Sequence, residues 1–351
     1  MEKIFKKQIE FYITNVCNYN CDNCNRLNNY YFSGHEAWGD YEAVYQRWSE
    51  RIEFGRITVL GGEPLLHPSL DQWILGLRRL WPRANIRINT NGTRLRYWYR
   101  RGFFDLLSSN DIELTINTHN RSNIDKVHQE VNSYLKDPVT EIIPRPDLDW
   151  SDAYRAVKDQ SWPDCATYQD FVKLPIWIQN ECRQIHGIDY DQWVKNTGFL
   201  KVQDRLDPKI KIVIDHYENF VTAPLKYSGE NTFTVYNSDP DAAHRVCRSK
   251  HCTHMMHGKM YKCHHMGILK EFSRQFEVAI NGEDRNLLES YQPLEVTADT
   301  ATMQDFLEQH IKNVIPQCKL CPSELKNIFL QSSTDKPKIK KIILIKPLSV
   351  V

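Results

Sequence analysis

Most of the ten cysteines in this chain are clustered. One group falls in residues 17–24, a second in residues 247–263 and a pair in residues 318–321, whereas Cys165 and Cys182 stand alone. An even number of cysteines permits disulfides, but a disulfide framework is typical of small secreted domains rather than of a chain of 351 residues. In a reducing compartment, clustered thiols indicate ligands of a metal ion or of an iron–sulfur cluster.

The first group, Cys17, Cys21 and Cys24, places three thiolates on one short loop. In a cubane [4Fe–4S] cluster each thiolate ligates one iron, so three protein ligands leave the fourth iron open. An open iron can chelate the amino and carboxylate groups of S-adenosylmethionine (SAM) and pass it an electron, which releases a 5′-deoxyadenosyl radical. A zinc site is the alternative, although zinc usually takes four ligands and no fourth lies nearby in sequence.

Alternating strands and helices are expected to position this loop. The hydrophobic patterns predict strands at 8–14, 56–60, 85–89, 112–118 and 209–214, and helices at 41–52, 69–80, 97–107 and 122–135. Such alternation favours a parallel sheet with helical crossovers, in which the loops after the strands share one rim. Residues 17–24, 61–64, 90–92 and Asn117 should therefore meet there.

The cysteine loop and its surroundings resemble the radical SAM superfamily. The resemblance rests on the CxxxCxxC spacing after an N-terminal strand and on Gly61-Gly62-Glu63-Pro64 after the second strand, and it covers about residues 8–120. It implies that Cys17, Cys21 and Cys24 ligate the cluster. The cofactor-binding residues that it implies are Gly61, Gly62, Glu63, Thr90, Asn91, Thr115 and Asn117, with the Glu63 carboxylate accepting from the SAM ammonium group.

One position departs from the superfamily pattern. The residue before the third cysteine is usually aromatic and packs on the adenine, but here it is Asn23. Tyr19 or a residue in 28–32 could take its place.

The later cysteines resemble a twitch domain, a shortened SPASM domain at the C-terminus of many radical SAM enzymes. The resemblance implies that Cys247, Cys263, Cys318 and Cys321 supply four thiolates to an auxiliary [4Fe–4S] cluster, with a short hairpin after Gly258. Cys252 is a fifth candidate, and the sequence leaves open which of the five is spare. A structural zinc ribbon is the alternative, because several histidines in residues 244–265 lie nearby, although each of them is expected at the surface or in the hairpin.

The fold predicted from these patterns is α/β, with a partial (β/α)6-type radical SAM barrel, a helical insertion and a small C-terminal iron–sulfur domain. The expected segments are a radical SAM core at 1–145, the insertion at 146–208, the end of the core and a connector at 209–245, the twitch-like domain at 246–325 and a tail at 326–351.

The expected function is that of a radical SAM enzyme that abstracts a hydrogen atom from a peptide or a small molecule, for oxidation or bond formation. A reductant such as flavodoxin or ferredoxin would supply the electron. The alternative is a non-enzymatic iron–sulfur or zinc protein for electron transfer or scaffolding. The net charge of +1 gives no field that recruits nucleic acid. Without an apolar run that could span a membrane or act as a signal peptide, a cytoplasmic location is expected.

Overall fold

The computed structural model describes residues 3–21, 24–28, 32–119, 123–143, 199–215, 219–220, 225–227, 233–247, 252–275, 282–324 and 328–329. Asn23, Cys165, Cys182 and most of the expected insertion and tail lie outside these residues. No helix in the described ranges is long and apolar enough to cross a membrane.

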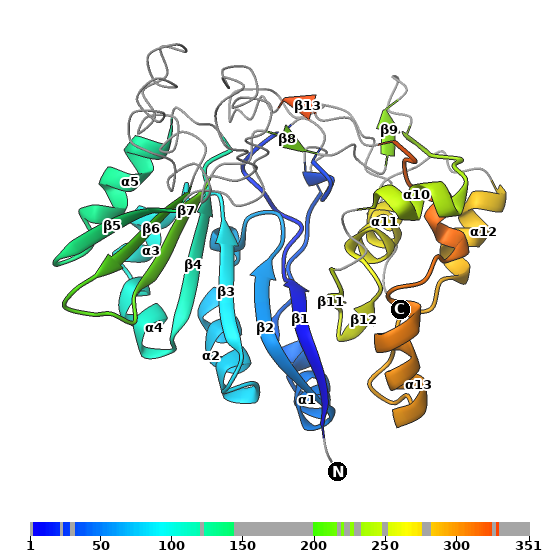
Figure 1. Ribbon diagram of the computed structural model, residues 1–351, viewed down its shortest axis with the longest axis horizontal. Helices are drawn as coiled ribbons and strands as arrows, with labels where there is room; N and C mark the ends of the chain where they lie inside the picture. The colour runs from blue at the N-terminus through cyan, green and yellow to red at the C-terminus, as the bar shows by residue number, and fades with distance from the viewer. Residues whose placement is uncertain are drawn as a thin grey trace, which may run out of the picture.

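A nine-stranded mixed sheet runs through the molecule (Figure 1) in the order β12-β11-β1-β2-β3-β4-β7-β6-β5. Its strands are β1 (Ile4–Tyr12), β2 (Ile52–Leu60), β3 (Asn85–Thr90), β4 (Ile112–Asn117), β5 (Pro138–Ile143), β6 (Phe199–Asp204), β7 (Lys211–Asp215), β11 (His254–Met256) and β12 (Lys259–Tyr261). Strands β1, β2, β3, β4 and β7 are successive parallel neighbours, and β11 adds to β1 in the same direction. Strands β5, β6 and β12 pair antiparallel.

The five predicted strands are all present, and the α/β class is confirmed. The sixfold strand–helix repeat is not observed, because β6 and β5 continue the described sheet in antiparallel fashion. Residues 199–204 were assigned to the helical insertion, and this prediction was wrong. Their side chains alternate between half-buried and buried along β6, which is the period-two pattern of a strand.

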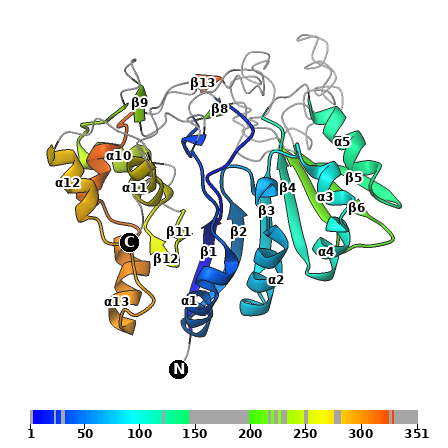
Figure 2. The ribbon, with the colours of Figure 1, turned by 180° about the vertical axis from the view of Figure 1, so that it is seen from behind.

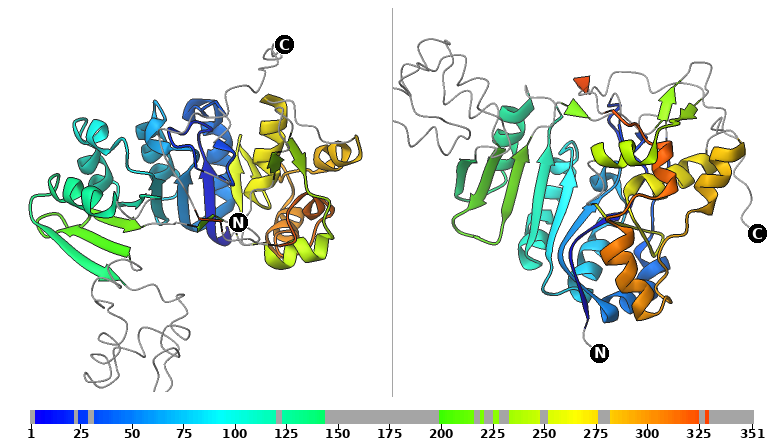
Figure 3. Two further views of the ribbon diagram at one scale, coloured as in Figure 1. Left: turned by 90° about the horizontal axis from the view of Figure 1, so that it is seen from above. Right: turned by 45° about the vertical axis from the view of Figure 1, so that its right-hand side comes forward.

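Helices cover one face of the central strands (Figures 1 to 3). They are α1 (Trp38–Arg51), α2 (Leu70–Leu80), α3 (Leu95–Tyr99) and α4 (Phe103–Ser109), with α5 (Ile124–Asn132) farther along the sheet. The single helix predicted at 97–107 is two helices, because Gly102 adopts a left-handed φ of 74° between them. The strands turn Ile86, Ile88 and Leu114 toward the buried face. Their intervening residues form a second, polar face.

The C-terminal part adds to the free side of β1. Strands β11 and β12 form a hairpin whose two turn residues, His257 and Gly258, both have positive φ, as a type I′ turn requires. Helices α10 (Pro240–Val246), α11 (His264–Gln275), α12 (Gly282–Ser290) and α13 (Thr300–Asp305) surround it. The cysteine-rich region therefore continues the core sheet. The shorter elements are η2 (Pro64–Leu66), β8 (Asn219–Phe220), β9 (Leu225–Tyr227), β10 (Phe233–Val235), η5 (Phe306–His310), η6 (Pro316–Leu320) and β13 (Ile328–Phe329).

Candidate cluster and cofactor site

The three cysteines of the first group lie on the loop that follows β1. Cys21 is buried, whereas Cys17 and Cys24 are half-buried. Backbone hydrogen bonds fold the loop: Cys24 N–H donates to the Cys21 carbonyl over 3.3 Å, and Leu27 N–H donates to the Cys24 carbonyl over 3.0 Å. Tyr19 N–H donates to Cys17 Sγ over 3.4 Å. The three predicted thiols thus share one folded loop, and this set of donors fits an iron–sulfur cluster that keeps one iron open.

The glycine pair lies against the segment that leads into this loop. Gly62 N–H donates to the Thr14 carbonyl over 2.7 Å, and Glu63 N–H donates to the Val16 carbonyl over 2.8 Å. A Cβ atom on Gly61 would lie 2.5 Å from the Thr14 carbonyl oxygen. Glycine is therefore needed here because two backbone segments pass closer than a side chain permits.

The Glu63 side chain is turned into the protein and is only 1% exposed. Its Oε1 accepts hydrogen bonds from Leu65 N–H over 2.9 Å and from Thr90 Oγ1 over 2.5 Å, while Oε2 accepts from Asn91 N–H over 2.6 Å. Burial raises the pKa of Glu63 to about 7, although these three donors act in the opposite direction. Donors of the chain itself therefore reach both carboxylate oxygens, and the bond to the SAM ammonium group stays a prediction.

Two polar side chains lie opposite each other on the polar face of the sheet. Asn89 of β3 and Thr115 of β4 are partners in the strand register. Among the described residues, Asn89 Oδ1 and Thr115 Oγ1 are buried without a hydrogen-bond partner. Thr115 was predicted as a site residue and Asn89 was missed. The period-two alternation of β3 was the available signal, because it places Asn89 on the face opposite Ile88 and Thr90.

The other predicted rim residues lie close to the cysteine loop or complete local turns. Asn91 Nδ2 donates to Asn18 Oδ1 over 3.0 Å and lies 4.0 Å from Cys17 Sγ. Asn117 Oδ1 accepts from His119 N–H over 3.1 Å. A pocket of about 220 Å³ opens beside the loop, and its lining includes Tyr19, Asn91, Gly92, Thr93, Thr118 and Lys126. Tyr19, the candidate to replace an aromatic residue at position 23, therefore faces a cavity at the rim.

Four of the five later cysteines surround one small cavity. They are Cys247, Cys263, Cys318 and Cys321. They come from the end of α10, the start of α11 and the η6 turn, so residues far apart in sequence meet here. Burial raises the pKa of Cys263 to about 12 and also raises the pKa of Cys318 and Cys321. These thiols would therefore release protons on binding a metal or cluster.

The fifth cysteine, Cys252, does not line this cavity. It lies beside Glu10, whose carboxylate pairs with Arg26 over 3.3 Å and with the ring of His254. The histidines were expected at the surface or in the hairpin, and for His264 and His265 this was wrong. Both are buried at the start of α11, and His265 Nδ1 lies 3.5 Å from Cys321 Sγ. Within the described ranges, no group of three or more histidine, cysteine or acidic side chains is arranged to hold a metal ion.

Comparison with known families finds a match in the first part of the chain. Residues 11–167 match the family model described as the Radical SAM superfamily. This part of the chain is therefore similar in sequence to radical SAM proteins. The matched segment contains the cysteine loop, the Gly61–Glu63 turn and the polar strand residues described above. No curated protein sequence matches the chain.

Solved structures similar to this chain include two complexes. One is BtrN in complex with AdoMet and 2-DOIA, with 24% identity and a TM-score of 0.27, covering 36% of this chain. The match spans 53% of the BtrN chain, or about half of its length. The other is Streptococcus suis SuiB bound to S-adenosylmethionine, with 12% identity and a TM-score of 0.40, covering 90% of this chain and 72% of that one.

Proposed function

We propose that this chain is a radical SAM enzyme that binds a [4Fe–4S] cluster through Cys17, Cys21 and Cys24. One observation carries the proposal: three thiols share a loop that is hydrogen-bonded to the Gly61–Glu63 turn, within the segment that matches the Radical SAM superfamily model. When bound, the cluster supplies the electron that cleaves SAM and yields a 5′-deoxyadenosyl radical, which removes a hydrogen atom from the substrate.

The polar face of the sheet would bind SAM. Asn89 and Thr115 present side-chain oxygens that lack partners within the described part of the chain, and buried polar atoms are costly unless they are hydrogen-bonded. Beside them, Arg87 Nε lies 2.6 Å from Glu113 Oε1, which keeps both charges paired on this face. A peptide or a small molecule would then meet SAM on the same face, which lies opposite helices α1 to α4 (Figure 3).

The cavity between Cys247, Cys263, Cys318 and Cys321 would hold an auxiliary [4Fe–4S] cluster. The support is that four thiols converge on one cavity and that Cys252 lies elsewhere, beside Glu10. A second cluster would accept an electron from the substrate radical and so favour net oxidation. A zinc ion at the same thiols is the competing occupant.

Anaerobic reconstitution with iron and sulfide, followed by dithionite and SAM, tests the first proposal. We expect 5′-deoxyadenosine from the native chain. A variant with Cys17, Cys21 and Cys24 replaced by alanine should produce none while it retains iron at the later cysteines. A native chain that binds iron but never cleaves SAM would favour a non-enzymatic electron-transfer protein instead.

A further inference from the structure

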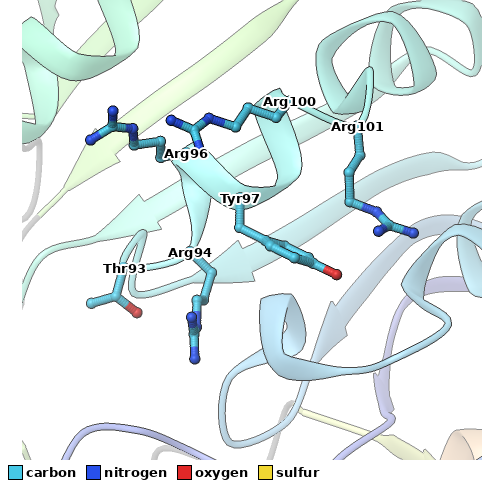
Figure 4. A pocket seen from close by; sticks show the side chains of 6 residues that line it. All are labelled: Thr93, Arg94, Arg96, Tyr97, Arg100 and Arg101. Carbon is cyan, nitrogen blue, oxygen red and sulfur yellow. The ribbon is translucent and has the colours of Figure 1, made fainter.

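Four arginines and a tyrosine form an exposed surface on and around α3. We call it the arginine surface, and it consists of Arg94, Arg96, Tyr97, Arg100 and Arg101. All five side chains are exposed, while Leu95 and Trp98 anchor the same short helix in the core. Together with Thr93 they line an open surface depression of about 610 Å³ (Figure 4).

Within the described part of the chain, the positive charges of this surface have no acidic partners. None of the four arginines forms an ion pair with a described residue, whereas Arg79, Arg83, Arg87 and Arg205 all do. Arg101 lies over the ring of Tyr97, 5.3 Å from its centroid. Four charges that no described acidic residue pairs lie on one small area, in contrast with a net charge of +1 for the whole chain. The concentration of charge therefore indicates an anionic partner.

The directions of the side chains indicate what kind of anion fits. In Figure 4, Arg96 and Arg100 extend to one side, Arg94 extends away from them, and Arg101 extends to the other side with Tyr97. The guanidinium groups do not converge on one point, as the capture of a single phosphate or carboxylate would require. Charges spread over an open surface match the distributed carboxylates of an acidic protein.

The depression that the arginine surface lines together with Thr93 reaches the cysteine loop at Thr93. Thr93 accepts a 2.8 Å hydrogen bond from Asn18 Nδ2, and Asn18 is the residue after Cys17. Thr93 Oγ1 also donates to Asn91 Oδ1 over 2.7 Å, and Asn91 Nδ2 lies 4.0 Å from Cys17 Sγ. A protein bound at this surface would therefore lie beside the loop that carries the first three thiols, outside the polar face where SAM and substrate would bind.

We propose that the arginine surface is the docking site of an acidic electron-donor protein of the flavodoxin or ferredoxin type. This inference rests on the proposed function. On docking, the reduced donor loses one electron and the first cluster gains it, so that SAM cleavage can follow. Electron-transfer encounters of this kind are small, weak and guided by charge, which suits a compact basic surface.

Binding and turnover measurements test the proposal on the full chain. The first variant carries Arg94→Gln, Arg96→Gln, Arg100→Gln and Arg101→Gln. The matched control removes four exposed positive charges elsewhere, through Arg56→Gln, Arg83→Gln, Arg205→Gln and Lys209→Gln. We expect an acidic flavodoxin to bind the first variant about tenfold more weakly than the native chain or the control at low salt, because four surface ion pairs are lost. The difference should vanish at high salt.

Turnover separates this inference from the proposed function. Flavodoxin-driven formation of 5′-deoxyadenosine should fall in the first variant, whereas dithionite-driven formation should not change. Equal flavodoxin binding by both variants, or no salt-sensitive binding to the native chain, would overturn the docking site. Loss of dithionite-driven cleavage in the first variant, or arginine-dependent binding of single-stranded RNA, would also overturn it. A native chain that binds flavodoxin through these arginines but never cleaves SAM would refute the proposed function alone.

Discussion

Gly62 passes so close to Val16 that a Cβ atom at position 62 would overlap the Val16 carbonyl group. The same Cβ atom would lie 2.9 Å from the side-chain amide of Asn28 on the far side of the cysteine loop. The position of Gly62 is therefore coupled to both ends of the loop that carries Cys17, Cys21 and Cys24.

Replacing Gly62 by alanine should displace the cysteine loop while leaving the sheet intact. We expect 5′-deoxyadenosine formation to fall by about tenfold to a hundredfold, because small misplacements of reacting groups are costly. The matched control is Gly39→Ala in α1, where an added Cβ meets nothing within 4 Å. If Gly62→Ala cleaves SAM as fast as Gly39→Ala does, the turn does not position the loop.

Replacing Asn89 by alanine should weaken SAM binding. Losing one hydrogen bond costs about 1 kcal/mol, which corresponds to roughly a fivefold higher dissociation constant. Asn85→Ala is the control, since Asn85 is exposed at the other end of β3 and lies on the same face of the strand. Calorimetric titration of the reconstituted variants with SAM measures both dissociation constants. Equal affinities in the two variants would show that Asn89 does not bind SAM.

Deleting single cysteines should separate ligands from the spare thiol. Cys252→Ala should keep about eight irons per chain, whereas Cys247→Ala should lower the count toward about four. Anaerobic analysis of iron and zinc in each variant provides the measurement. Four irons with one zinc in the native chain would show that the second site is structural, and the proposed electron-acceptor role would then fail.

Stability should fall as the pH rises from about 4.5 to about 7, because of Glu36. Burial raises the pKa of this carboxyl to about 7, despite the nearby His257. The folded state therefore binds the proton more tightly than the unfolded chain does. The stabilisation that this proton gives to the folded state is lost as the pH rises through that range. Glu36→Gln should therefore abolish a decrease on the order of 3 kcal/mol in the free energy of unfolding over this pH range. Urea unfolding across this pH range measures it, with the exposed Glu50→Gln as control. Equal slopes in both variants would exclude Glu36 as the cause.

Local patterns were sufficient to predict much of the fold and the first cysteine loop. The strand that precedes Cys17 and the strand that ends at Leu60 have strong apolar patterns, so their existence and order follow from the sequence. It was harder to predict on which face of the sheet each polar side chain lies. Thr90 was assigned to SAM, yet it donates to Glu63 in the interior, while its neighbour Asn89 lies on the polar face. A shift of one residue along a strand reverses the face, so the type of residue alone could not decide between them.

Contacts between distant segments could not be predicted from the sequence. Nothing in the spacing of Cys247 and Cys252 shows which of them lies near Cys321, because that depends on how α10 packs against η6. Likewise, the sequence before β6 has no clear hydrophobic period, so this strand was not predicted. Its antiparallel pairing with β7 is a contact between two strands, which hydrophobic patterns along the chain do not specify.

The parallel pairing of β1 with β11 has a consequence for the order of events during synthesis. Glu10 of β1 lies beside His254 of β11, which is synthesised much later. The backbone groups on this side of β1 therefore stay unpaired until the C-terminal part of the chain has left the ribosome. Until then β1 presents an unpaired strand edge, which is a template for association with other chains. Newly made chains that stall before β11 should therefore depend on chaperones, even though every strand from β1 to β7 has already been made.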